Sequence, residues 1–170
     1  MAVMAYALSL IVGLAVGIGI VALLFRKKVL DMTFDERQER ARGKAYRYGF
    51  FTLLGCLLVY GATDLVFGRW CDVLAGCVIC VCVSITVFGA VCILNDAYLS
   101  LREQPRKVMT VFALAAAFNL VLGGVNVLKG GVVENGVLTF RAINPICGVT
   151  MVVLMGLYIV NHLLREREAE

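Results

Sequence analysis

Few side chains in this chain could do chemistry, and most of them lie inside long apolar runs. Asp64 is the one acidic residue well inside such a run, and Tyr60 lies one helical turn before it. Another run carries Asn119 and Asn126 among small residues, at helical spacing. Polar groups are costly in an apolar environment, so these four residues are our candidate site for a small ligand, a proton or a cation.

This candidate site depends on how the apolar runs pack. If the runs that hold Asp64 and Asn126 pack together, these two residues lie at a similar depth. The alternative is that the amides and small residues only hold helices together. Asp64 would then reach interfacial water or pair with Arg69 or Arg141.

The seven cysteines offer a second kind of chemistry. Cys77 and Cys80 form a CxxC pair, but the pair begins roughly two turns into an apolar run, where a thiol behaves as a small hydrophobe. Cys71 and Cys147 fall at run ends on one side, so a disulfide between them is an alternative to two free thiols. Such cysteines at helix ends resemble those of quinone-linked thiol oxidoreductases, although no pair lies in an exposed loop.

The remaining residues do not predict a metal centre, a cofactor or a catalytic site. His162 is the lone histidine, whereas metal and haem sites usually need several ligands. The sequence has no phosphate-binding glycine loop and no catalytic triad pattern. We therefore expect no cofactor and no enzyme activity.

The elements that must position these residues follow from composition. Hydrophobic residues make up 61% of the 170 residues, against about 45–50% in a soluble domain. A transmembrane helix needs roughly 20 apolar residues, and none of the runs alternates as a barrel strand would. We expect a single all-α domain of five transmembrane helices. The predicted spans are about 4–25, 48–67, 71–94, 108–128 and 145–164.

The charges between the spans predict an orientation. The segment 26–47 holds eight of the 16 Lys and Arg residues, and thirteen of the 16 fall on the same side of the membrane. Basic loops stay in the cytoplasm, which places the N-terminus outside and the C-terminus inside. The basic flank follows the first run instead of preceding it, so we expect an uncleaved first span. The net charge of +4 therefore reflects orientation and does not indicate nucleic-acid binding.

The segment 26–47 has its own helical signals. Thr33 and Glu36 have the spacing of a capping box, and Glu36 and Arg40 have that of a helical ion pair. We expect a turn or two of helix that runs into the second span. The segment either rests on anionic lipid headgroups or docks a cytoplasmic partner. The docking residues would be Asp35, Glu36, Arg37 and Gln38.

The outer segment 129–144 predicts a β-hairpin. Asn135 and Gly136 stand between two β-rich arms, and Asn-Gly tolerates the positive φ values of a type I′ turn. An isolated two-stranded ribbon is marginal, so we expect it to pack on the helix ends or on a partner.

One stretch resembles a known group of proteins. Asp35–Gln38, followed by Arg42–Tyr46 and the aromatic start of the next span, is similar to a segment in small integral membrane proteins of Gram-positive bacteria. Those uncharacterised proteins carry D-E-R-Q shortly before an apolar span. The resemblance covers residues 33–55 and implies a multi-pass protein of the bacterial plasma membrane. It assigns no site residue.

The leading hypothesis for function is a non-enzymatic membrane protein that acts through binding, as an accessory, sensor or protective subunit. The alternative is a small transporter or channel component built around Asp64 and the Asn119–Asn126 stripe. A membrane thiol oxidoreductase is the third hypothesis. The partners we expect are a bilayer with anionic headgroups, a cytoplasmic or membrane protein, and a second copy of the chain, for which Gly13 and Gly17 form a GxxxG face.

Overall fold

The computed structural model describes residues 33–101 and 103–169 of the chain. The predicted first span, 4–25, lies outside the described residues, as does its GxxxG face. The described helices are α2 (Glu36–Phe67), α3 (Val73–Leu94), α4 (Pro105–Leu128) and α5 (Ile143–Ala169). Between α4 and α5 lie strands β1 (Val133–Glu134) and β2 (Val137–Leu138), and the short 3-10 helix η1 (Phe140–Ala142).

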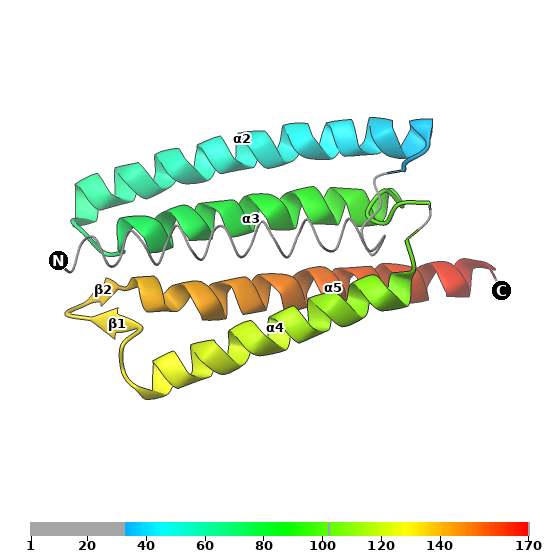
Figure 1. The fold of residues 1–170 in the computed structure, drawn as a ribbon. Helices are drawn as coiled ribbons and strands as arrows, with labels where there is room; N and C mark the ends of the chain where they lie inside the picture. The colour runs from blue at the N-terminus through cyan, green and yellow to red at the C-terminus, as the bar shows by residue number, and fades with distance from the viewer. Residues whose placement is uncertain (1–32, 102, 170) are drawn as a thin grey trace.

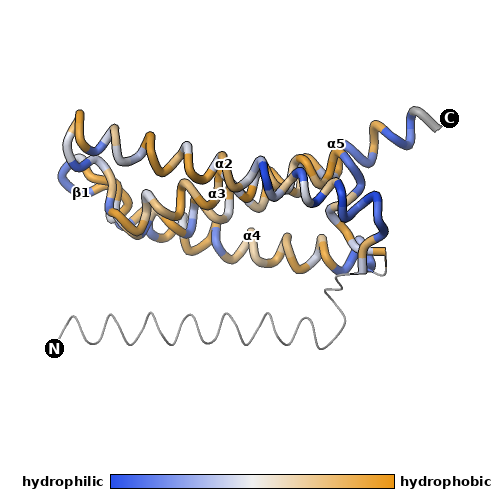
Figure 2. The backbone as a smooth tube through the Cα atoms, turned by 90° about the horizontal axis from the view of Figure 1, so that it is seen from above, coloured by the Kyte–Doolittle hydropathy of each residue, from blue (hydrophilic) through white to orange (hydrophobic). Residues whose placement is uncertain are grey.

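Four helices of the described part are long and apolar enough to cross a membrane, judged by length and composition. They match the four predicted spans that fall in this part of the chain, except that α3 begins two residues after the predicted start at 71. Hydrophobic residues run along the helices, and hydrophilic residues gather mostly at the two ends of the bundle (Figure 2). The prediction of long apolar helices is therefore confirmed for these four ranges.

Helix α2 begins with a capping box, but not with the predicted one. Asp35 is the N-cap: its side chain accepts from the backbone N–H of Gln38 at 2.7 Å, and the Gln38 side chain accepts from the Asp35 N–H at 3.3 Å. The predicted box of Thr33 and Glu36 was therefore two residues too early. The backbone at Thr33 is held elsewhere, because its carbonyl oxygen accepts from the N–H of Leu101 at 3.0 Å. Glu36 does pair with Arg40 at 2.8 Å, as predicted.

The helices pack in the order α2, α3, α5, α4 (Figure 1). Small residues make these contacts close. Gly123 of α4 faces Pro145 of α5, and an added Cβ would lie 2.9 Å from the proline ring. Gly148 of α5 faces Leu120 of α4 in the same way. Close approach at small residues is the usual way that helices associate in lipid.

The interior of the bundle is made mostly of small side chains, and the large apolar ones point outward. Ala45, Ala75 and Cys92 are fully buried, whereas Leu58 is 75% exposed and Leu65 is 87% exposed. A soluble protein rarely exposes apolar surface on this scale. The distribution is the one expected for helices that face lipid.

The two ends of the bundle differ in structure (Figure 1). At the hairpin end, Asn135 and Gly136 have φ values of 52° and 79°, which confirms the predicted turn. The N–H of Asp72 donates to the carbonyl of Leu138 at 2.8 Å, and the N–H of Leu138 donates to the carbonyl of Trp70 at 2.9 Å. The ribbon thus packs on the α2–α3 connection. The opposite end, which we call the basic end, holds the start of α2, the loop 95–104 and the end of α5.

Candidate functional site

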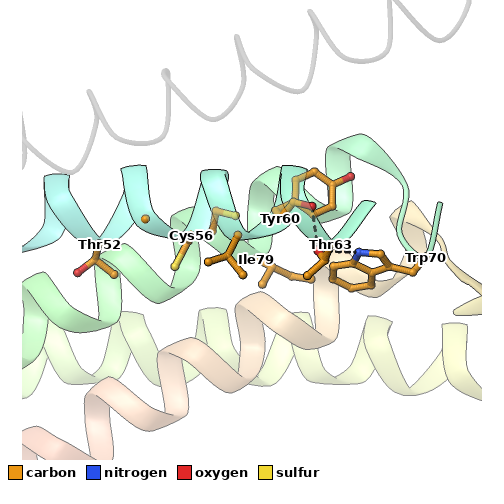
Figure 3. Close-up of a pocket in the computed structure, with 10 residues that line it drawn as sticks. Thr52, Cys56, Tyr60, Thr63, Trp70 and Ile79 are labelled. Carbon is orange, nitrogen blue, oxygen red and sulfur yellow. Dashed lines mark hydrogen bonds between the residues drawn. The ribbon is translucent and has the colours of Figure 1, made fainter. Parts of the chain in front are cut away.

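A cavity of ≈ 530 Å³ lies between the described faces of α2 and α3, toward the hairpin end (Figure 3). Its volume lies within the range of about 300–1,000 Å³ that is usual for small-molecule sites. Gly55 and Val59 of α2 are exposed at its edge, so the cavity opens on the side of the bundle. The residues that line it are Thr52, Gly55, Cys56, Val59, Tyr60, Thr63, Trp70, Gly76, Ile79 and Cys80.

Three of the four lining residues with a polar N–H or O–H group, Tyr60, Thr63 and Trp70, lie at one end of this cavity, and the fourth is Thr52. The indole N–H of Trp70 donates to the hydroxyl oxygen of Thr63 at 3.1 Å, and the Thr63 hydroxyl donates to the carbonyl of Tyr60 at 2.9 Å. The Tyr60 hydroxyl donates to the carbonyl of Cys71 at 3.4 Å. The rings of Tyr60 and Trp70 meet edge to face, with centroids 5.7 Å apart. Figure 3 shows this polar end beside the apolar remainder.

Gly76 is what allows the Tyr60 ring to lie across α3. A Cβ added at Gly76 would lie 2.4 Å from Cζ and 2.8 Å from the hydroxyl oxygen of Tyr60. Any larger residue must therefore displace the ring. By contrast, a Cβ at Gly55, on the α2 side of the cavity, meets no heavy atom of the described residues within 4 Å.

The lining contains no charged side chain. Each side-chain hydrogen of the polar end is already donated within the protein, and the rest of the lining is aliphatic or thiol apart from the hydroxyl of Thr52. Such a lining suits an apolar chain with a small uncharged polar group near Trp70. It does not suit a free ion, because an ion needs ligands or countercharge to replace its water.

The basic end is a second cluster of polar contacts, and it joins three segments of the chain. The side-chain amide of Gln38 donates to the carbonyls of Asp96 at 2.7 Å and Leu99 at 3.3 Å. Arg42 donates to the carbonyl of Ala97 at 3.1 Å, and its guanidinium lies 4.0 Å from the centre of the Phe34 ring. The start of α2 is thereby fastened to the loop 95–104.

Helix α5 holds the same loop from its other side. Arg165 pairs with the carboxylate of Asp96 and donates to the carbonyl of Leu94 at 3.1 Å. Asn161 donates to the carbonyl of Ile93 at 3.1 Å. Asp96 has a positive φ of 54°, so a tight turn puts its carboxylate within reach of α5.

No protein-family model matches this chain, no curated protein matches it, and no solved structure matches it. The arguments for function therefore rest on the geometry above. Among the described residues, no group of three or more His, Cys, Asp or Glu side chains could hold a metal ion.

The structure separates the four residues of the sequence-derived candidate site. Tyr60 lines the α2–α3 cavity, and Asp64 lies one turn further along α2, half-buried and outside the lining. Asn119 donates to the carbonyl of Ala115 in its own helix at 2.9 Å, and Asn126 donates to the carbonyl of Arg141 at 3.2 Å. Because α2 and α4 lie at opposite ends of the packing order, the structure does not bring Asp64 together with the two amides.

The arginines proposed to pair with Asp64 have other partners. Arg69 pairs with Asp72 at 2.7 Å, and Arg141 pairs with Glu134 of the hairpin at 3.3 Å. Asp72 also accepts from the N–H of Phe140 at 3.2 Å through its second oxygen. These contacts fasten the hairpin to the start of α3, and the described residues give Asp64 no ion pair.

The disulfide between Cys71 and Cys147 that the sequence left as an alternative is not formed. Cys71 and Cys147 are free thiols, and Cys147 lies beside Cys82 of α3. Cys71 is buried under the hairpin, and burial raises the pKa of its thiol, with a further rise from the carboxylates of Asp72 and Asp64. A raised pKa keeps a thiol protonated and makes it a weak nucleophile. The geometry therefore does not assemble a thiol–disulfide centre at this position.

The D-E-R-Q residues divide into two pairs. Asp35 and Gln38 are used inside the protein, as cap and as clamp on the loop 95–104. Glu36 and Arg37 are exposed, and Glu36 is paired with Arg40. Asp35 is exposed as well, but its side chain is engaged as the cap, so Glu36 and Arg37 are the two that could meet a partner without breaking the contacts of the cap and the loop.

Tyr98 is a half-buried titratable group in the loop at the basic end. Its ring lies 6.3 Å from that of Phe112 and 6.5 Å from that of Tyr158, centre to centre. Burial raises the pKa of Tyr98 to about 12, with smaller contributions from Cys92 and Glu103. The fold thus favours the neutral phenol.

Sequence reasoning missed Thr63, Trp70 and Gly76 at the cavity and the Asp96–Arg165 pair at the basic end. Trp70 is the single tryptophan of the chain, but its neighbours in the sequence do not link it to Tyr60 or Thr63. Gly76 looked like one more glycine in an apolar helix. Its importance depends on Tyr60, which lies sixteen positions earlier in the chain, and no periodic pattern links the two.

Proposed function

We propose that this protein is a non-enzymatic membrane protein that acts through binding, and that its ligand is the apolar chain of a neutral membrane amphiphile. The observation that carries the proposal is the α2–α3 cavity, which is apolar along most of its length and has its hydrogen-bonded polar side chains at the Tyr60–Trp70 end. In this role the protein would serve as an accessory, sensor or protective subunit in a bacterial plasma membrane.

The position of the opening supports a ligand that comes from the bilayer. Val59 is 62% exposed and Trp70 is 36% exposed, so the mouth of the cavity faces the same surroundings as the lipid-facing side chains. A chain could enter sideways without crossing a polar surface. Its head would remain near Trp70, at the level where tryptophan is commonly found in membrane proteins.

We further propose five spans, with residues 4–25 as the first, the hairpin end outside and the basic end in the cytoplasm. The arrangement of the described helices supports this orientation. Arg69, Lys129 and Arg141 are at the hairpin end, whereas the other described basic residues are at the starts of α2 and α4 and at the end of α5, which all lie at the basic end. A C-terminal reporter that is active only in the cytoplasm should give a signal; activity of a reporter that works only outside would reverse the assignment.

Native mass spectrometry of the full chain, extracted in a mild detergent, tests the ligand proposal. Gly55→Leu adds a side chain at the cavity lining, where a Cβ meets no described heavy atom within 4 Å, so we expect it to lose a co-purifying neutral lipid that the wild type retains. Gly61→Leu is the matched control, because Gly61 is on the same helix, is equally open and lies outside the lining. The proposal fails if wild type and Gly55→Leu retain the same molecules, as they would if residues 4–25 or a second copy of the chain filled the α2–α3 cavity.

A further inference from the structure

A groove at the basic end carries charges that the fold does not use. It has a volume of ≈ 320 Å³ and lies between the start of α2 and the end of α3. Its lining residues are Glu36, Arg37, Arg40, Ala41, Lys44 and Asn95. We propose that this groove binds the phosphate of an anionic phospholipid headgroup. The proposal is independent of the α2–α3 cavity.

The basic side chains at the start of α2 differ in whether the fold engages them. Arg42 is engaged with the loop 95–104 and with Phe34. Arg37 and Lys44 are exposed, and neither makes an ion pair with another described residue. The Glu36–Arg40 pair neutralises one cation of the groove, which leaves a net charge of about +2 from Arg37 and Lys44.

The groove presents several hydrogen-bond donors that suit a phosphate. Arg37, Arg40 and Lys44 are separated by three and four positions, so they share one face of α2. Arg37 offers a planar fork of donors that matches phosphate oxygens, and Lys44 offers a compact charge. Asn95 uses one amide N–H on the carbonyl of Val91 at 2.8 Å, which leaves its second N–H for an acceptor in the groove.

The residues next to the groove indicate its level relative to the membrane. Tyr46 and Tyr48 follow directly on α2 and are 59% and 55% exposed, and the apolar part of α3 ends at Leu94 beside Asn95. Aromatic residues of this kind mark the boundary between hydrocarbon and headgroups. A groove with net positive charge at this boundary meets lipid phosphates whichever side of the membrane it faces. It should prefer phosphatidylglycerol to phosphatidylcholine, whose phosphate is balanced by its own ammonium group.

The test is a titration of the purified full chain in detergent with phosphatidylglycerol, and with phosphatidylcholine as the neutral lipid. Arg37→Gln with Lys44→Gln should weaken phosphatidylglycerol binding about 20- to 30-fold, since each basic residue near an anionic headgroup contributes about fivefold. Arg106→Gln with Lys107→Gln is the matched control. It removes two exposed charges from the same end but outside the groove, and we expect a change of less than about twofold.

Three results would overturn the proposal. One is an equal loss in both double variants, which would indicate general attraction to the basic end. Another is no loss in the Arg37/Lys44 variant. The third is displacement of phosphatidylglycerol by low millimolar inorganic phosphate, which would assign the groove to a soluble phosphate. All four substitutions are at exposed positions, and an unchanged thermal unfolding temperature checks that the variants are folded.

Discussion

Replacing Gly76 by Ala should disturb the cavity through a single methyl group. That methyl carbon would lie 2.4 to 2.8 Å from three atoms of Tyr60, well inside the ordinary contact distance of about 3.5–4.0 Å. The Tyr60 ring must therefore move. Its movement is opposed by the edge contact with Trp70 at 5.7 Å and by the hydrogen bond to the Cys71 carbonyl.

The size of the effect follows from three contributions. Overpacking costs about 1–3 kcal/mol, and loss of an aromatic pair costs about 0.5–1.5 kcal/mol. Alanine in place of glycine favours the helix by about 1 kcal/mol. We expect Gly76→Ala to lower the free energy of unfolding by about 0.5–3.5 kcal/mol. Gly55→Ala, which meets no described neighbour, should instead leave it unchanged or raise it by up to about 1 kcal/mol.

The assay is reversible unfolding in mixed micelles, followed by far-ultraviolet circular dichroism. In a Tyr60→Ala background the clash is absent, so Gly76→Ala should no longer destabilise the protein, and the two substitutions should be strongly non-additive. Equal stability of the Gly76→Ala and Gly55→Ala proteins would refute the close packing of Tyr60 on α3.

Three more expectations concern the rest of the described structure. Gln38→Ala should lower the free energy of unfolding by about 1–3 kcal/mol in the same assay, because it removes half of the capping box and both hydrogen bonds to the loop 95–104. Glu39→Ala is the control and should change this free energy by less than about 0.5 kcal/mol. Gly123→Ala should cost about 1–3 kcal/mol because its methyl meets the rigid Pro145 ring, whereas Gly124→Ala meets nothing described, and equal effects would contradict the α4–α5 contact. Burial raises the pKa of Tyr98 to about 12. The neutral phenol therefore contributes about 2–3 kcal/mol of stability below pH 10, and this contribution is lost as the pH rises toward 12. The difference between the free energies of unfolding at pH 9 and at pH 12 should be smaller in Tyr98→Phe than in wild type.

The four described apolar helices and the hairpin could be predicted from the sequence because their signals are local. An apolar run of 20 residues has few alternatives to a membrane helix, and Asn135-Gly136 needs only its own backbone to form the turn. The start of α2 was misplaced by two residues because Thr33 and Asp35 both precede a suitable partner. Asp35 is the N-cap because the carbonyl of Thr33 is already bonded to the N–H of Leu101.

The candidate site was harder to predict because it depends on which helices touch. Asn126 has the spacing of a polar stripe, but its amide meets the backbone at Arg141, and α4 packs on α5 through Gly123 and Pro145. Gln38 looked like a residue for a partner, yet its acceptors are backbone carbonyls about sixty positions away. Backbone acceptors leave no mark in the sequence, so neither contact could be read from residue types.

Fluorescence of Trp70 tests the central proposal most directly, because Trp70 is the single tryptophan and lines the cavity. Titration of the full chain in detergent with a brominated monoacylglycerol should quench this fluorescence to saturation in wild type and in Gly61→Leu. The same titration should give much weaker, non-saturating quenching in Gly55→Leu. Quenching that rises without saturation in wild type, or that is identical in Gly55→Leu, would contradict an amphiphile site between α2 and α3.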